Sequence, residues 1–297
     1  MRVAEYTSEL GRWDEVERVS DLRLRPYVHG YFATSSALAR PVRERHLPAT
    51  EVPMLLNFGA AHTRVDAESV SEPQRLDHSW VTGLQTHYHL SDAIGERRFM
   101  VVRFTPLGAH LFFRLSMDSL TDRAVPLEQI DLRVASLVSD HVMVARGWAE
   151  RFDAMERLIG SRVTPFAVPP NIEWAWNVLV RTSGQTPVGS LASTAGCSHR
   201  HLIQQFRTRF GLPPKKVAML LRFNRSINAV TQCEPANSAR KPYLEGSRAD
   251  DDALEAHWVH IAAECGYFDQ PHFIHEFKTF AGATPSAFLR GIPTPLS

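Results

Sequence analysis

Cysteines and long apolar runs are scarce in this chain of 297 residues. The only cysteines are Cys197, Cys233 and Cys265, too few for a zinc-binding quartet or a disulfide framework. The sequence opens without an apolar signal segment, and no stretch of about eighteen apolar residues occurs that would span a bilayer. We therefore expect a cytoplasmic protein in a reducing setting, with no membrane partner.

Familiar catalytic motifs are also absent. There is no Gly-x-Ser-x-Gly, no glycine-rich phosphate loop and no HExxH sequence. The sequence accordingly predicts no catalytic residue, no cofactor and no metal, and we expect that the protein is not an enzyme.

Acidic residues are missing from one long segment. None occurs between Glu173 and Glu234, whereas the chain as a whole has a formal charge of only +1. The same segment contains a set of basic residues: Arg181, Arg200, Arg207, Arg209, Lys215, Lys216, Arg222 and Arg225. A local concentration of positive charge is typical of a surface that binds phosphates.

A passage within and beyond this segment occurs twice. Apolar positions and a glycine recur seventy positions later, with Val188, Leu191, Ala192, Ala195 and Gly196 repeated as Trp258, Ile261, Ala262, Cys265 and Gly266. After one inserted residue, Ser198, Leu202, Phe206, Arg207, Gly211 and Pro214 are repeated as Asp269, Phe273, Phe277, Lys278, Gly282 and Pro285. Each copy reads as a short helix, a glycine turn and a capped second helix, which predicts two helix-turn-helix units.

The first unit has side chains suited to reading DNA. Thr186 and Pro187 predict a capped helix start, and Ser198 predicts the cap of the second helix. Opposite the apolar stripe of that helix lie Arg200, Gln204 and Arg207. Arginine and glutamine pair bidentately with guanine and adenine edges in the major groove. Just beyond this helix, Lys215 and Lys216 are expected to face phosphates.

The second unit is poorer in such chemistry. Asp269 is the expected cap, with Gln270 beside it, and Pro271, His275 and Lys278 are expected on the outward face. Because proline has no side-chain hydrogen-bond donor, we expect this unit to contribute more to positioning the protein on DNA than to sequence discrimination.

These residues carry a family resemblance. Roughly residues 170–291 resemble the DNA-binding domain of AraC/XylS-family transcription regulators, and Ile261 to Pro285 carry that family's signature. The resemblance implies two units joined by a long helix, with recognition helices in successive major grooves. It places base contacts on Arg200, Ile203 and Gln204, and on Gln270, Pro271 and His275. Ile203 stands where the family pattern has a polar, base-reading residue, so it offers only an apolar contact.

The rest of the chain predicts an α+β protein. Short apolar runs between residues 20 and 125 predict a mostly antiparallel β barrel or sandwich, and the resemblance implies a cupin-like sensor. Apolar residues at helical spacing follow over 127–159, and they indicate either a dimerisation element or ordinary hydrophobic core. The proline-rich 164–170 predicts a boundary between a sensing and dimerisation domain (1–165) and an all-α DNA-binding domain (166–297) with two helix-turn-helix units. A polar insertion at 232–257 has a loop-like composition.

Four residues are candidates for effector binding. His87 and His89 are one residue apart, so on a strand they would face the same side. No carboxylate follows at the usual cupin distance, which favours a structural or ligand-facing pair over a metal site. Arg103 or His110, near a predicted strand-to-helix turn, would meet an anionic effector.

We therefore expect a sequence-specific, DNA-binding transcription regulator controlled by a small-molecule effector. Its partners would be double-stranded DNA, the effector, a second copy of the chain and, for an activator, RNA polymerase. One alternative is a metal-dependent cupin-type enzyme fused to a DNA-binding module. Another is an architectural DNA binder without an effector.

Overall fold

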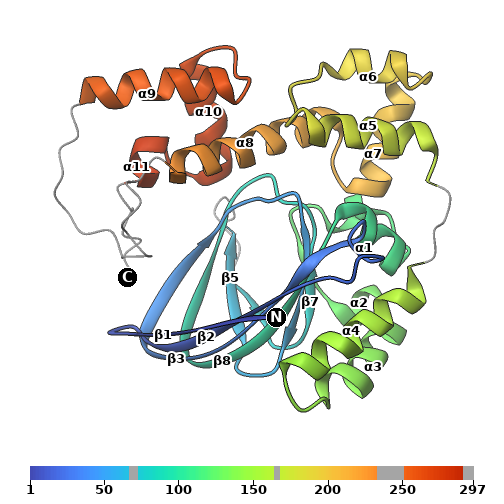
Figure 1. Cartoon of the computed structure of the whole chain (residues 1–297), viewed down its shortest axis with the longest axis vertical. Helices are drawn as coiled ribbons and strands as arrows, with labels where there is room; N and C mark the ends of the chain where they lie inside the picture. Colours follow the sequence, from blue (N-terminus) through green and yellow to red (C-terminus); the bar gives the residue numbers. More distant parts are fainter. Residues whose placement is uncertain (67–72, 164–167, 233–250, 290–297) are drawn as a thin grey trace.

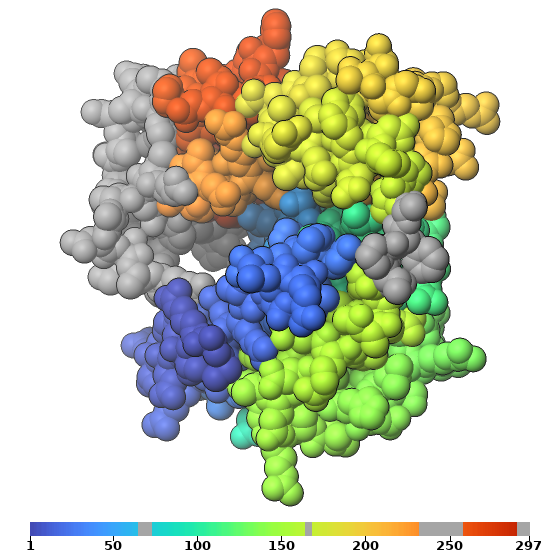
Figure 2. Space-filling view, turned by 45° about the vertical axis from the view of Figure 1, so that its right-hand side comes forward, coloured from blue at the N-terminus to red at the C-terminus, as the bar shows by residue number. Residues whose placement is uncertain are grey.

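The computed structural model describes residues 1–66, 73–163, 168–232 and 251–289. A curved β-sheet with flanking helices makes up the N-terminal half, and a layer of helices covers one end of it (Figure 1). Figure 2 shows the same two layers in contact, the helices from α5 onward lying against the strands and helices of the N-terminal half. The α+β class predicted from the sequence is confirmed.

In the described part of the N-terminal half, nine strands form one sheet, and all the strand pairs found there are antiparallel. The central path runs β1-β2-β3-β8-β4-β7-β9, with β5 paired to both β6 and β8. The strands are β1 (Arg2–Ser8), β2 (Gly11–Val19), β3 (Val28–His46), β4 (Val52–Asn57), β5 (His62–Asp66), β6 (Gln74–Leu76), β7 (Trp80–Thr82), β8 (His89–Phe104) and β9 (Ala124–Pro126).

The apolar run from Phe99 to Val102 in β8 supplies side chains to both faces of the strand. In β8, Met100, Val102 and Phe104 are completely buried, and the Phe104 ring packs against Phe112 with ring centroids 5.1 Å apart. The alternate residues Phe99 and Val101 point to the other face and line a cavity inside the curved sheet. β8 therefore separates the helical core from the cavity.

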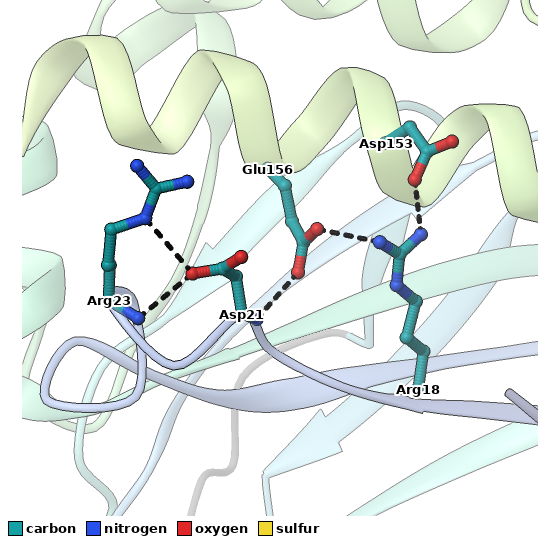
Figure 3. A network of polar contacts seen from close by, with 5 residues as sticks. All are labelled: Arg18, Asp21, Arg23, Asp153 and Glu156. Carbon is teal, nitrogen blue, oxygen red and sulfur yellow. Dashed lines mark hydrogen bonds and ion pairs between the residues drawn. The ribbon is translucent and has the colours of Figure 1, made fainter.

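Helices close one flank of the sheet. They are α1 (Pro106–Phe113), the 3-10 helix η1 (Met117–Leu120), α2 (Leu127–Ile130), α3 (Leu132–Val138), the π-helix η2 (Ser139–Met143) and α4 (Trp148–Arg162). An ion-pair network ties α4 to β2: Arg18 donates to Asp153 at 2.5 Å and to Glu156 at 2.7 Å, and Glu156 accepts the Asp21 amide (Figure 3). Phe152, Met155 and Ile159 are fully buried beneath this network. α4 thus belongs to the core of the N-terminal half, while its use in dimerisation stays a prediction.

The C-terminal layer is entirely helical in the described residues. It comprises α5 (Pro170–Arg181), α6 (Val188–Thr194), α7 (His199–Phe210), α8 (Pro214–Gln232), α9 (Asp251–Glu264), α10 (Gln270–Ala281) and α11 (Pro285–Leu289). α8 crosses the end of the sheet and joins a group formed by α5, α6 and α7 to a group formed by α9, α10 and α11 (Figure 1). No helix within the described ranges has the length and apolarity that a membrane span requires.

Three expectations need correction. Thr186 does not cap α6, because its hydroxyl donates to Thr182 Oγ1 at 3.0 Å and the helix begins after Pro187 without a side-chain cap. The expected loop at 232–257 is helical from Asp251, where α9 begins, while 233–250 lie outside the described residues. Strands begin at Arg2, well before the expected residue 20, so a further hairpin extends the sheet.

The predicted division at 164–170 falls largely on residues outside the described ranges, and the two-domain boundary stays a prediction. The same holds for a cupin-like connectivity of the sheet.

Candidate DNA-binding surface and ligand cavity

The first helix-turn-helix unit forms as its sequence predicts. α6 ends before Gly196, whose φ of 63° lies in the left-handed region that glycine enters at little cost. Ser198 then caps α7 by accepting a hydrogen bond from the His201 amide at 3.2 Å. Leu202 and Phe206 are completely buried, so the orientation of α7 is fixed by the core.

The predicted base-reading residues of α7 face away from that core. Arg200, Gln204 and Arg207 are exposed, and Ile203 is half-buried at the edge of the same face. Lys215 and Lys216 are exposed in the first turn of α8, which is separated from α7 by three residues. The structure therefore brings the predicted DNA-contacting residues of the first unit to neighbouring, solvent-facing positions.

The second unit has the same construction. Gly266 and Gly282 have φ values of 80° and 72°, and Asp269 caps α10 by accepting the His272 amide at 2.8 Å. Pro271, His275 and Lys278 are exposed, Gln270 is half-buried, and Phe273 and Phe277 are buried. Both predicted recognition helices thus have their expected caps and outward faces.

One basic residue of the acid-free segment serves the fold. Arg222 of α8 donates to Glu276 of α10 at 3.0 Å, and the Glu276 carboxylate is only 2% exposed. This buried ion pair fixes α10 on the connecting helix, so Arg222 and Glu276 position the second unit. Sequence reasoning missed the pair because Glu276 reads as one more surface charge on an amphipathic helix.

A cavity of about 540 Å³ lies inside the curved sheet. Strands β2 to β8 supply its wall, which is mostly apolar and includes four aromatic side chains: Trp13, Phe32, Trp80 and Phe99. Cavities of this size and composition bind small organic molecules. The sequence did not reveal it, because seven strands contribute a few residues each.

Polar side chains gather on one part of the cavity wall. Arg97 donates to Glu44 at 3.0 Å, and Arg64 donates to the amide oxygen of Gln85 at 2.6 Å. His46 is hydrogen-bonded to Ser91 Oγ at 2.7 Å and stacks on His89 with centroids 4.7 Å apart. Four buried atoms of the wall have no hydrogen-bond partner among the described residues: Ser36 Oγ, His62 Nε2, His89 Nδ1 and Arg97 Nε.

The cavity histidines are held neutral. Burial lowers the pKa of His62 to about 4, and the Arg97 guanidinium adds to that effect. Burial also lowers the pKa of His89 to about 2, with a further contribution from Arg64. A neutral imidazole has one donor and one acceptor nitrogen, so these rings are able to hydrogen-bond either kind of group on a ligand.

Of the four predicted effector residues, His89 alone is found in this wall. The expected His87–His89 pair on one strand is wrong: β8 begins at His89, and His87 lies in the preceding turn, 3.6 Å from Asp122. Arg103 does not line the cavity, and its guanidinium lies beside Gly30, with Nη2 3.4 Å from the position of a Cβ atom built on that glycine. His110 donates from Nδ1 to the Leu115 carbonyl at 2.8 Å, which fixes a turn after α1.

The alternative of a metal-dependent enzyme requires a cluster of ligands. Among the residues that the structure describes, no group of three or more His, Cys, Asp and Glu side chains is arranged to hold a metal ion. His46, His62 and His89 share the cavity, but their ring contacts are with one another, with Trp80 and with Phe99.

Comparison with known proteins gives matches to both halves. A family model described as a domain of unknown function (DUF6597) matches residues 18–126, which run from β2 to β9. Among solved structures, ToxT from Vibrio cholerae with a bound unsaturated fatty acid is 10% identical and matches with a TM-score of 0.44, over 94% of this chain and 99% of that chain.

A transcriptional regulator from Chromobacterium violaceum, described as containing an AraC-type DNA-binding domain, is 20% identical with a TM-score of 0.29 over 42% of this chain and 95% of that one. The chain is similar to an AraC-type regulator. The iron(II) form of HppE matches at 9% identity and a TM-score of 0.28, over 35% of this chain and 56% of that chain. The search of curated proteins found no match.

Proposed function

We propose that the protein is a sequence-specific DNA-binding transcription regulator and not an enzyme. The observation that carries this proposal is the pair of helix-turn-helix units, each with its recognition helix fixed by a buried core and its outer face exposed. Arg200, Gln204 and Arg207 supply the hydrogen-bonding groups that distinguish bases in the major groove. Lys215 and Lys216 supply charge for the phosphates on either side.

The cavity supports control by a small molecule. We propose an effector with a largely apolar body, which fits the aromatic wall, and with at least one hydrogen-bonding group. Burying polar atoms without partners is unfavourable, and an effector that pairs with Arg97 Nε or His62 Nε2 relieves that cost. The arrangement favours an effector-controlled regulator over an architectural binder, which has no use for such a cavity.

Selection of bound sequences from a random duplex library tests the DNA-binding function. We expect the full-length protein, at physiological salt, to enrich a motif with two contact blocks about one helical turn apart. Tight, salt-sensitive binding without enrichment would instead support the architectural alternative, because phosphate contacts alone carry no sequence information.

The effector is tested separately by a thermal-shift screen with small aromatic and aliphatic acids, alcohols and amides. A matched variant, Ser36→Phe, fills part of the cavity from its wall and is expected to abolish any shift. A hit that shifts Ser36→Phe equally would bind elsewhere.

A further inference from the structure

Both recognition helices contact the N-terminal half through their C-terminal ends, at equivalent positions of the repeated motif. Gly211 ends α7 and Gly282 ends α10, each in a left-handed conformation. Thr121 Oγ1 donates a hydrogen bond to the Gly211 carbonyl at 2.7 Å, and Arg45 Nη1 donates to the Ala281 carbonyl at 3.0 Å. The last carbonyls of a helix have no partner within it, so both contacts satisfy groups that the helix leaves open.

The contact with α7 is broad and closely packed. Both α1 and η1 contact α7, and Met117 and Leu120 of η1 belong to the same buried core as Phe210. A Cβ atom built on Gly211 would lie 3.2 Å from both the Met117 carbonyl oxygen and Thr121 Oγ1. Buried apolar surface supports this contact, so opening it is costly.

The contact with α10 relies on polar and aromatic groups. The Arg45 guanidinium lies over the Tyr88 ring, 4.7 Å from its centroid, and a Cβ atom built on Gly282 would come within 2.0 Å of Tyr88 Cε1. Nearby, Asn224 Nδ2 of α8 donates to the Pro48 carbonyl at 2.7 Å. Arg45 and Tyr88 are both part of the rim of the sheet, at the end of β3 and just before β8.

The residues beside Arg45 and Tyr88 in sequence line the cavity. His46 follows Arg45, His89 follows Tyr88, and the two histidines are directly opposed in the β3–β8 register. Because side chains alternate along an extended chain, one pair faces the cavity while its neighbours face α10. The stacked His46 and His89 rings and the Arg45–Tyr88 pair are therefore carried by the same two backbone segments.

We propose that Arg45 and Tyr88 form a latch on α10 that occupancy of the cavity opens, while α7 remains held. A ligand that displaces the His46–His89 stack moves the two segments that carry the latch. Release frees α10 from the rim of the sheet, while Arg222 and Glu276 still fix it on α8, so the way the second unit is presented to DNA changes without a change in its spacing from α7. This inference rests on the proposed DNA-binding function, but its structural part is measurable without DNA.

Hydrogen–deuterium exchange of the full-length protein tests the latch. In Arg45→Met and Tyr88→Ala we expect roughly tenfold faster exchange of amides in the last turn of α10, because this turn opens more often without the latch. The Gly282 amide, which donates to the Lys278 carbonyl, reports on that turn. Exchange at the equivalent Gly211 amide is expected to stay unchanged. The control Arg43→Met removes an arginine two residues away that pairs with Asp92 on the sheet.

The link to the cavity is tested by filling it beside the histidine stack. Ser91→Phe adds a ring next to His46 and is expected to accelerate α10 exchange as the latch variants do. Ser36→Phe adds the same ring elsewhere in the cavity wall and is expected to leave α10 unchanged. If Ser91→Phe does not fold, His46→Ala, which removes half of the stack, takes its place with the same expected result.

Equal exchange of α10 in wild type and latch variants would overturn the latch, and an unaffected α10 in the folded cavity variant would overturn its coupling to the cavity. The effect of the latch on DNA binding is measured separately, as the affinity of the latch variants for the duplex that the wild type selects. A wild type that selects no sequence removes the proposed function, while the exchange data still decide whether the latch exists.

Discussion

At the scale of single residues, Gln204 is the side chain whose chemistry bears most directly on sequence recognition. It is exposed on α7, one helical turn from Arg200, and the opposite face of the helix is completely buried. We expect Gln204→Ala to cost ~1–3 kcal/mol on the preferred duplex and to relax discrimination at one base position. Binding titrations with a set of single-base variants measure both effects.

The neighbouring glutamine provides the control for that substitution. Gln205 is half-buried and accepts a hydrogen bond from Arg209 on the same helix. Gln205→Ala is expected to leave base discrimination intact. A uniform loss over all duplexes in Gln204→Ala would assign Gln204 to the phosphate backbone instead.

His62 makes stability depend on pH. Its pKa falls from 6.5 to about 4 on folding because the ring is buried, so the unfolded chain binds more protons between these values. Stability is therefore complete above pH 6.5 and is lost as the pH falls toward 4. We expect His62→Gln to reduce the loss of unfolding free energy between pH 7 and pH 4.5 by about 2 kcal/mol, measured by urea denaturation.

An exposed histidine serves as the comparison. His78→Gln removes an imidazole from the surface and is expected to leave the pH dependence unchanged. If the unfolding free energy of His62→Gln and of the wild type changed with pH in parallel, groups other than His62 would bind the protons taken up on unfolding.

At the scale of elements, the turn between α7 and α8 carries the predicted phosphate contacts. Lys215 and Lys216 are exposed in the first turn of α8, beside the recognition helix. We expect Lys215→Gln and Lys216→Gln each to weaken binding equally on all duplexes and to reduce the slope of log affinity against log salt by about 1. Fluorescence anisotropy at several salt concentrations measures the slope.

Arg157 supplies the matched control, because it is exposed on α4 in the N-terminal half. The substitution Arg157→Gln removes one positive charge from the chain without altering the proposed DNA-binding surface. A salt slope that responds to Arg157→Gln as much as to Lys215→Gln would reflect net charge alone.

The same elements show how far sequence reasoning extends. Ser198 and Asp269 predicted the caps of both recognition helices correctly, because a cap is a local requirement of a helix terminus. Thr186 failed as a cap because its hydroxyl donates instead to Thr182, four residues earlier at the end of α5.

The candidate cavity was less accessible to prediction. His89 was identified, but its pairing with His87 depended on where β8 begins. Asp122, from a distant segment, accepts hydrogen bonds from the amide and the hydroxyl of Thr86 and so holds the turn that contains His87. His62 and Arg64 come from β5 and Arg97 comes from β8, and alternation along one strand does not indicate which face the sheet curves around.

At the scale of the whole molecule, the connecting helix sets the distance between the two units. α8 has 19 residues and is therefore ~28 Å long, close to the ~34 Å of one turn of DNA. The Arg222–Glu276 pair fixes α10 on α8, and the core fixes α7 at its other end. Two units held in this way demand a fixed spacing between their contact blocks.

Altered spacing in the selected duplex tests that demand. Insertion of about five base pairs between the blocks turns the second block to the opposite face, and we expect affinity to fall to that of a duplex with the second block scrambled. Insertion of about ten restores the face but moves the block one turn farther, beyond the reach of α8, so we expect no recovery. Units joined by a flexible tether would recover with the longer insertion, and that result would contradict a rigid α8 connection.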